Sequence, residues 1–252
     1  KLSGKNDYYF FDQDMYQEIM KRYLTENDLK NAIKNDSFEM LYQPQYEINS
    51  HKLIGFESLI RLKNKKGEYI DTQQFINIAE KSGLICEVDM WVMHNVMKQM
   101  KDFVTLYPDI EVSINVSGKH ITNKGFVEKV VDSLSETGFP PKNLKIEITE
   151  SSYIRYIDEA AQVIKRLKVI GVKTALDDFG TGFSSLNYLS KMPVDMLKID
   201  KSFVDKMLIK ENDRSFVDII IKLGHIMGCK VIAEGVEDHA QLFALASLSC
   251  DF

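Results

Sequence analysis

Residues 174–186, Thr174-Ala-Leu-Asp-Asp-Phe-Gly-Thr-Gly-Phe-Ser-Ser-Leu186, decide how the rest of the sequence is interpreted. A short apolar run ends in two adjacent acids, Asp177 and Asp178, and a loop punctuated by glycines follows them. Two carboxylates held close together raise each other's pKa, so such a pair is costly unless a divalent cation lies between them. Taken alone, the pair fits a solvated surface turn as well as it fits a metal site. The other strands decide between these two interpretations, because several of them repeat the pattern.

The stretch belongs to an alternation of predicted strands and helices that begins near Phe38. Short runs of apolar residues predict strands at residues 38–48, 52–62, 111–117, 144–150, 173–178, 194–200 and 230–233. Helical spacing predicts helices at residues 73–81, 84–106, 125–137, 159–170, 184–190, between 201 and 227, and at 238–247. Such alternation favours parallel strands joined by right-handed crossovers.

The first two predicted strands are joined by Asn49-Ser50-His51, a hairpin-sized turn, so the first strand is expected to be antiparallel. Seven strands are counted, and the sequence ends at Phe252, where an eighth strand is expected to begin. The sequence therefore predicts an α/β fold, a TIM-type (β/α)8 barrel with an antiparallel first strand and a truncated last strand. An open doubly wound sheet is the alternative.

The residues before Phe38 follow a different pattern. Residues 1–11 suggest a turn and a short strand without a nearby partner. Apolar residues at near-helical spacing between Asp14 and Lys34 predict either one long helix or two helices. A break is expected near Thr25, where Thr-Glu-Asn-Asp resembles a capping box.

Composition limits the class of protein. The 252 residues, 44% hydrophobic and 27% charged, suit one large soluble domain, and no run is long and apolar enough for a membrane span. The scattered cysteines Cys86, Cys229 and Cys250 argue against a zinc knuckle and favour a reducing cytoplasm, although a membrane anchor in a longer parent protein stays open. The formal charge of −5 gives no basic field for long nucleic acid.

One parity of several predicted strands is polar, although both faces of a barrel strand should be largely apolar. The polar residues that alternate with apolar neighbours are Ser113, Asn115, Ser117, Lys145, Glu147, Thr149, Lys198 and Asp200. Glu57 and Arg61 likewise share one parity of the second strand. Helices must cover the apolar parity, so the polar side chains are expected to point into the lumen or its mouth.

Active sites of such barrels lie at the carboxyl ends of the strands. The residues expected at or near those ends are Asn115, Glu147, Asp177, Asp178, Lys198 and Glu234. A single Glu–Lys pair would be a structural ion pair, but Lys198 and Arg61 alone do not neutralise about five converging carboxylates. Ligation by oxygen without His or Cys suits Mg²⁺, Mn²⁺ or Ca²⁺. Two such ions suit cleavage of a phosphate ester, and enolisation and aldol chemistry stay open.

Eight short motifs, in this order and spacing, resemble the EAL-domain cyclic di-GMP phosphodiesterases over residues 29–250. They are Tyr42-Gln43-Pro44, Glu57-Ser58-Leu59-Ile60-Arg61, Phe75-Ile76-Asn77-Ile78-Ala79-Glu80, Asn115-Val116-Ser117, Glu147-Ile148-Thr149-Glu150, Asp177-Asp178-Phe179-Gly180-Thr181-Gly182, Leu197-Lys198-Ile199-Asp200 and Glu234-Gly235-Val236-Glu237. Residues 1–12 resemble the tail of a GGDEF domain. The resemblance implies a linker helix at 13–28 and an EAL domain at 29–252 that is incomplete at its C-terminal end.

The resemblance also implies a role for each site residue. The implied ligands of two Mg²⁺ or Mn²⁺ ions are Glu57, Asn115, Glu147, Asp177, Asp178 and Glu234, with Asp177 bridging the ions and Ca²⁺ expected to inhibit. Lys198 would contact the attacking water, and the implied substrate-binding residues are Gln43, Arg61 and Asp200. Glu150 and Glu237 would fix the loop at residues 178–185. The implied protein is a cytoplasmic, homodimeric hydrolase of bacterial second-messenger signalling, with pGpG as product and a GGDEF domain upstream.

Two departures from the family pattern matter. The signature Glu-Ala-Leu is Glu57-Ser58-Leu59 here, and the small serine should leave Glu57 in place. The closing Gln-Gly motif is absent from the sequence up to Phe252, so weakened activity is expected. A catalytically weak receptor for cyclic di-GMP is the alternative function, and a purely structural partner domain fits less well. Because all six metal positions are filled, the enzyme is favoured.

Overall fold

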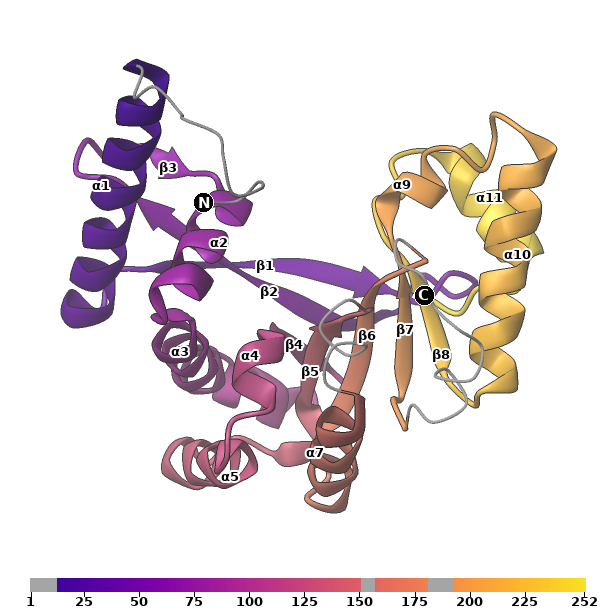
Figure 1. Ribbon diagram of the computed structural model, residues 1–252. Helices are drawn as coiled ribbons and strands as arrows, with labels where there is room; N and C mark the ends of the chain where they lie inside the picture. The colour runs from indigo at the N-terminus through magenta and orange to yellow at the C-terminus, as the bar shows by residue number, and fades with distance from the viewer. Residues whose placement is uncertain (1–12, 151–156, 181–192) are drawn as a thin grey trace. The chain divides into compact units, whose positions relative to one another are not determined.

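The structure, a computed structural model, describes residues 13–150, 157–180 and 193–252 (Figure 1). The chain divides into two units: the larger comprises residues 40–59 and 89–252, and the smaller comprises residues 1–39 and 60–88. Each unit is described by itself below.

Seven strands of the main sheet lie in the order β1-β2-β4-β5-β6-β7-β8. Their bounds are Glu39–Tyr46 (β1), Leu53–Lys63 (β2), Glu111–Asn115 (β4), Leu144–Thr149 (β5), Lys173–Phe179 (β6), Met196–Ile199 (β7) and Lys230–Ala233 (β8). All pairs from β2 to β8 are parallel. The hairpin between β1 and β2 is closed by a hydrogen bond from Glu47 N to Lys52 O at 2.9 Å. The predicted antiparallel first strand is therefore confirmed.

Residues 251–252 lie beside both ends of this strand order. Ala233 N donates to Phe252 O at 2.9 Å, and Ile48 N, just after β1, donates to Asp251 O at 3.0 Å. Residues 251–252 thus make backbone contacts with β8 and with the β1 hairpin. They occupy the position that is expected for an eighth strand. The barrel prediction is confirmed, and the open doubly wound sheet is wrong.

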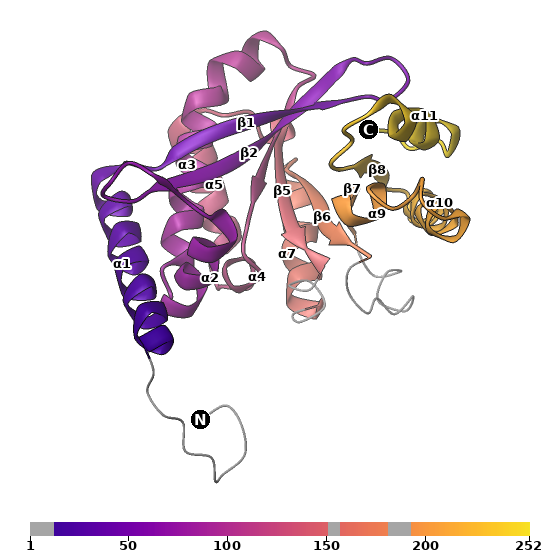
Figure 2. The same ribbon diagram turned by 90° about the horizontal axis from the view of Figure 1, so that it is seen from above.

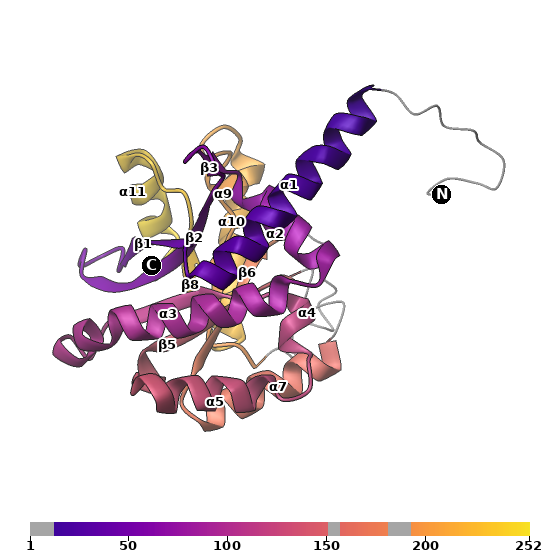
Figure 3. The ribbon, with the colours of Figure 1, turned by 90° about the vertical axis from the view of Figure 1, so that its left-hand side faces the viewer.

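Helices of the larger unit cover the outer face of the parallel strands. Among the described residues, the helices that lie wholly in it are α4 (Gly118–Ile121), α5 (Phe126–Thr137), α7 (Ile157–Val169), α9 (Lys201–Val204), α10 (Glu211–Ile226) and α11 (His239–Ser247). Helix α7 packs on β6 and α10 packs on β7 and β8 (Figure 2), while α5 and α7 run side by side (Figure 3). Helix α10 approaches the sheet closely at Gly224, where a Cβ would lie 2.5 Å from Val231 Cγ2.

The apolar parity of the strands packs under these helices. Residues with essentially no exposure include Val112, Ile114, Ile146, Leu176, Leu197, Ile199 and Val231. The opposite parity faces the lumen and carries the polar residues that the sequence analysis singled out, because successive side chains of a strand point to opposite faces. Because the apolar side chains are buried under the helices, the polar side chains of the same strands must point into the lumen.

The smaller unit contains the whole of the N-terminal helix. Helix α1 (Gln13–Asn35) packs on α2 (Thr72–Ser82), and the two-residue strand β3 (Tyr69–Ile70) pairs antiparallel with the end of β2. Helix α3 (Ile85–Leu106) begins in the smaller unit and continues in the larger.

Of the two alternatives for the N-terminal helix, the structure has the single long helix and not the break near Thr25. Helix α1 is continuous through Thr25, whose side chain is buried at 4% exposure rather than capping a helix. A buried threonine within an amphipathic helix gives the same four-letter pattern as a capping box, so packing overrides the local signal. The sequence analysis did not predict β3 or α4, and its predictions for residues 1–11 and 184–190 lie outside the described residues.

Within the described ranges, no helix combines the length and apolar character needed to cross a membrane.

Candidate active site

Lys198 is the centre of the site. Its side chain is 1% exposed on the lumen parity of β7, and its Nζ forms ion pairs with four carboxylates from four different elements. The partners are Glu57 Oε2 at 3.1 Å, Asp177 Oδ1 at 3.1 Å, Glu234 Oε1 at 2.6 Å and, closer still, Glu147 Oε2. We call these five residues the acid cluster.

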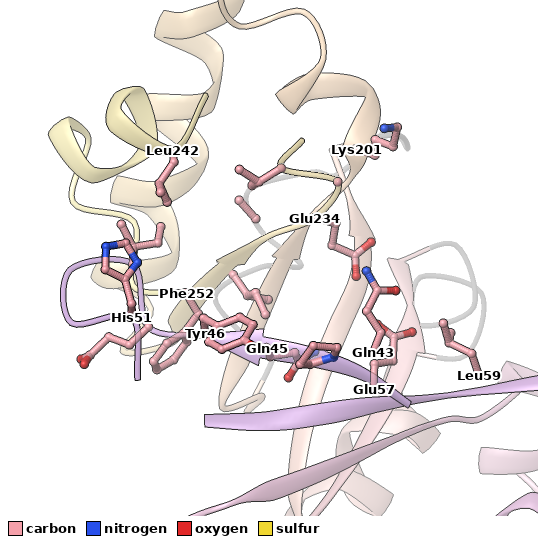
Figure 4. A pocket seen from close by; sticks show the side chains of 17 residues that line it. Gln43, Gln45, Tyr46, His51, Glu57, Leu59, Lys201, Glu234, Leu242 and Phe252 are labelled. Carbon is pink, nitrogen blue, oxygen red and sulfur yellow. The ribbon is translucent and has the colours of Figure 1, made fainter. Parts of the chain in front are cut away.

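Strand register brings these carboxylates together. Glu147 on β5 pairs with Asn115, the last residue of β4, and the Asn115 carboxamide Nδ2 donates to Glu57 Oε1 at 2.9 Å. Asp177 lies near the end of β6, and Glu234 directly follows β8. Because parallel strands end at the same edge, residues far apart in the sequence meet at one mouth. Figure 4 shows Gln43, Glu57 and Glu234 pointing toward one another.

Burial and like charge perturb the acids of the cluster. Burial raises the pKa of Glu57, and the neighbouring Glu147 raises it further. Burial also raises the pKa of Asp177 despite the opposing effect of Lys198, and it raises the pKa of Glu234 to about 7. Burial alone would lower the pKa of Lys198, but its acid neighbours, Glu147 first, hold it well above the usual range. The lysine is therefore a permanent cation that four acids share.

The backbone is constrained at the end of β6, which includes Asp178, and at the glycine that follows it. Asp178 has a φ of +56°, in the left-handed region, and its N–H donates to Asp177 Oδ1 at 2.9 Å. Gly180 has a φ of +97°, and a Cβ there would lie 2.9 Å from the ring of Phe203. Glu150, 1% exposed, accepts a hydrogen bond from Gly180 N at 2.8 Å. Burial raises the pKa of Asp178, with smaller contributions from Asp177 and Asp200.

The remaining predicted residues lie in several places. Gln43 lines a cavity of about 700 Å³ together with Glu57 and Glu234. Asp200 caps α9, where its side chain accepts from Ser202 N at 3.0 Å. Glu237 contacts Lys201 closely and is 71% exposed. No contact with the 178–180 turn is recorded for it among the described residues.

Arg61 belongs to the smaller unit. Its Nη1 donates to Ile60 O at 2.9 Å and lies 3.5 Å from Thr72 Oγ1. Both partners are residues of the same unit.

The sequence analysis missed two residues of this region. Gln45, 7% exposed, lines the cavity, and its Oε1 has no hydrogen-bond partner among the described residues. It shares the parity of Gln43 on β1, a signal that was available in the sequence. Lys201 lies over Gly235, where a Cβ would be 2.4 Å from Lys201 Cγ. The φ of +69° at Gly235 also requires glycine, so the Glu-Gly pair after β8 has a steric cause.

The chemistry of the acid cluster fits a hard divalent cation. The possible ligands are the carboxylate oxygens of the cluster and the carboxamide oxygen of the neighbouring Asn115. Mg²⁺ and Mn²⁺ prefer oxygen donors of this kind. Glu147 Oε1 is buried and lacks a hydrogen-bond partner among the described residues, although such an atom is costly to leave unpaired. In the arrangement described here the acids close around Lys198, and no three His, Cys, Asp or Glu side chains of the described ranges form a group able to hold an ion.

The fold and the site together define a class: barrel proteins that gather acids from several strands at the carboxyl-end mouth. Comparison with known families identifies the member of that class. The EAL domain model matches residues 26–252, so the chain belongs to the EAL domain family.

Individual relatives agree with this assignment. The chain is 34% identical over 251 residues to the signaling protein YkoW of Bacillus subtilis, covering 100% of this chain and 31% of YkoW. It is 32% identical over 252 residues to the bifunctional diguanylate cyclase/cyclic di-GMP phosphodiesterase MucR of Pseudomonas aeruginosa, covering 100% of this chain and 37% of MucR. The chain thus spans about a third of the length of these relatives.

A solved structure of the PaMucR phosphodiesterase in complex with c-di-GMP has the same fold. It is 33% identical in sequence, with a TM-score of 0.85, covering 90% of this chain and 92% of that one. The TIM-type barrel is therefore supported independently of the strand pairing.

Proposed function

We propose that this chain hydrolyses cyclic di-GMP to linear pGpG with the help of two divalent ions, Mg²⁺ or Mn²⁺. The observation that carries the proposal is the convergence of four acids on one buried lysine at the mouth of an EAL-family barrel. Two names support the substrate: MucR is a cyclic di-GMP phosphodiesterase, and the PaMucR structure is a c-di-GMP complex.

The four acids of the acid cluster, together with Asn115 and Asp178, supply the ligands in this proposal. Glu57, Asn115, Glu147 and Asp177 would hold one ion, and Asp177 would share the second with Asp178 and Glu234. When bound, such ions lower the pKa of a water molecule and offset charge on the phosphate. The crowding of acids favours this assignment, because burial already raises the pKa of Glu57 and Glu234, and a cation would relieve that cost.

Lys198 acts as a hydrogen-bond donor rather than as a base. Its pKa lies well above the usual range, so the amine keeps its proton at neutral pH. Its three N–H groups orient the attacking water and stabilise the negative charge that develops on the phosphate oxygens.

The reaction consumes one water molecule. The water oxygen forms a bond to phosphorus, the bond from phosphorus to one 3′ oxygen breaks, and the water protons end on that oxygen and in solvent. Gln43, Arg61 and Asp200 would bind the dinucleotide, with Arg61 on a phosphate oxygen. Glu150 accepts a hydrogen bond from Gly180 N and would in this way order Asp178 as a ligand of the second ion. Glu237 would help to fix the same loop, residues 178–185.

The proposal extends to the longer protein. Residues 1–12 would be the tail of an upstream GGDEF domain, residues 13–28 a linker helix, and residues 29–252 the EAL domain. The working form would be a homodimer in the cytoplasm of a bacterium. Ca²⁺ should inhibit, because it tolerates irregular coordination that does not hold the reacting groups as tightly as Mg²⁺ does.

Turnover of cyclic di-GMP tests the function directly. The purified chain with Mn²⁺ should form pGpG, and removal of the ion with EDTA should abolish the product. Asp177→Asn should remove turnover while the protein stays folded, because the substitution keeps the shape but removes a bridging charge. Intact binding of cyclic di-GMP without any turnover would favour the receptor, and Asp177→Asn with unchanged turnover would exclude that residue from the site.

A further inference from the structure

A second polar cluster lies behind the turn that follows Asn115, the last residue of β4. It consists of Asp89 on α3, with Ser117 and His120 at the start of α4, and we call it the Asp89 cluster. Asp89 is 5% exposed and His120 is 0% exposed. These three residues do not belong to the acid cluster, and polar side chains are seldom buried unless their hydrogen bonds serve the structure or the function.

One carboxylate oxygen holds the cluster together. Asp89 Oδ2 accepts from Ser117 N at 3.1 Å and from Ser117 Oγ at 2.9 Å. It also lies 3.2 Å from His120 Nδ1. The Ser117 hydroxyl in turn accepts from His120 N at 3.2 Å and so caps α4. A single side chain of α3 therefore fixes both the backbone and the cap of the turn after β4.

Two contacts hold the His120 ring in place. Its Nδ1 lies 3.2 Å from Asp89 Oδ2, and the ring packs edge-on to Phe126 at 4.9 Å. Nε2 is buried and has no hydrogen-bond partner among the described residues. The packed imidazole therefore serves as a fixed wall of the turn.

Asn115 stands only two residues before Ser117. Its carboxamide donates to Glu57 Oε1, and the N–H of the intervening Val116 donates to Glu147 O at 3.0 Å. The short segment from Asn115 to Ser117 is thus anchored on one side by the acid cluster and on the other by Asp89.

We propose that Asp89 is a positioning residue for Asn115: by fixing Ser117 and His120 it sets the direction in which the Asn115 carboxamide enters the acid cluster. The inference deepens the proposed function, since it assumes that Asn115 contacts a bound ion. Supporting groups of this kind cost about 10–100-fold in metal affinity or activity when they are removed.

The first test reads the geometry without any metal. In the ¹⁵N-labelled, metal-free protein, the side-chain amide signals of Asn115 are assigned by their loss in Asn115→Ala. Asp89→Ala should shift these signals and speed their hydrogen exchange, because the carboxamide loses its fixed contact with Glu57. Asp89→Asn keeps an acceptor for Ser117 N and should retain the wild-type signals. Unchanged signals in Asp89→Ala would overturn the proposal.

The second test reads turnover of cyclic di-GMP with Mn²⁺. Asp89→Ala should lower turnover by about 10–100-fold and raise the Mn²⁺ concentration needed for half-activation. In an Asn115→Ala background the same change should cost little more, because residues that act through one group are not additive. Losses that multiply would show that Asp89 acts independently of Asn115 and would overturn the proposal.

Asp195→Ala is the matched control. Asp195 accepts from Thr174 N at 3.0 Å and from Lys168 Nζ at 3.1 Å, at the amino ends of the strands. Its loss should lower the melting temperature and leave turnover unchanged. If Asp89→Ala does not fold, Ser117→Ala replaces it, since that change removes the hydroxyl of the same cluster and should shift the Asn115 signals in the same direction. Absence of turnover in the wild-type protein would refute the proposed function, and the amide signals would still decide the role of Asp89.

Discussion

Two lysines are buried inside the strands of the larger unit, and they differ in what surrounds them. Lys198, at the carboxyl end of β7, is shared by four acids. Lys145, near the amino end of β5, pairs with Glu111 at 2.9 Å and lies 3.4 Å from Met196 Sδ, while Lys173 holds the other oxygen of Glu111. Both lysines are 1% exposed.

The difference lies in the local balance of charge. At the amino end two lysines share one acid, and one of them, Lys173, is half-exposed, so water solvates its remaining charge. At the carboxyl end four acids share one lysine, so that group retains a surplus of negative charge and suits an additional cation. Burial alone does not separate a structural ion pair from a functional site; the ratio of acids to cations does.

Replacing each lysine with methionine should have its most different effects on the turnover of cyclic di-GMP. Lys198→Met removes a donor to the developing phosphate charge, and losing one such donor costs about 10²–10³-fold in rate. Lys145→Met should leave turnover within a few-fold of the wild type, because it lies away from the mouth. The measurement is the initial rate of pGpG formation. Equal losses in the two variants would remove the distinction.

Mn²⁺ should also change the free energy of unfolding of these two variants by different amounts. Leaving a buried charge unpaired costs about 3–5 kcal/mol, so Lys198→Met should destabilise the metal-free protein by an amount of this order. Added Mn²⁺ should restore part of that loss through binding to the native state alone. Lys145→Met should gain no more from Mn²⁺ than the wild type gains. Urea unfolding with and without the ion gives the comparison, and an equal response of both variants would contradict it.

The group at the amino end, Glu111 with Lys145 and Lys173, should stabilise the folded protein only in a defined range of pH. Burial opposes ionisation of Glu111, but Lys145 and Lys173 outweigh it and lower the pKa below 4.5. A lowered carboxyl pKa stabilises the folded state above the unfolded pKa, and this stabilisation is lost as pH falls through the folded value. Glu111→Gln should therefore destabilise the protein near neutral pH, and by progressively less as the pH falls below 4.5.

Asp109→Asn serves as the control for this pH dependence. Asp109 is 81% exposed and pairs with Lys52 at 3.4 Å, so its removal should change the pH profile little. Urea midpoints between pH 3 and pH 7 give the profile. A difference between Glu111→Gln and the wild type that is constant across this range would refute the assignment.

The sequence predicted the mouth well for a physical reason. Polar residues on one parity of a buried strand have only the lumen to enter, so Glu57, Glu147 and Lys198 could be placed before any coordinates were known. The alternation of strands and helices predicted the barrel in the same way. Both signals are periodic, and periodicity is what strand and helix packing imposes on a sequence.

The errors arose where a local pattern competes with tertiary packing. Thr25 looked like a cap but is buried within α1. Asp89 gave no signal, because one acid in a helix is ordinarily a solvated residue, and only the fold brings it beside Ser117. The exposed contact of Glu237 with Lys201 joins the loop after β8 to the first residue of α9, and no spacing rule connects the two residues.

The backbone contacts of residues 251–252 have a consequence for the order of events during folding. Ile48, early in the larger unit, pairs with a residue near the opposite end of that unit. Until this contact forms, the β1 hairpin has one free edge, and the loop that must be closed is nearly as long as the unit itself, which slows the step. Folding chains of this domain should therefore rely on their internal parallel strands for early stability and close the ring late.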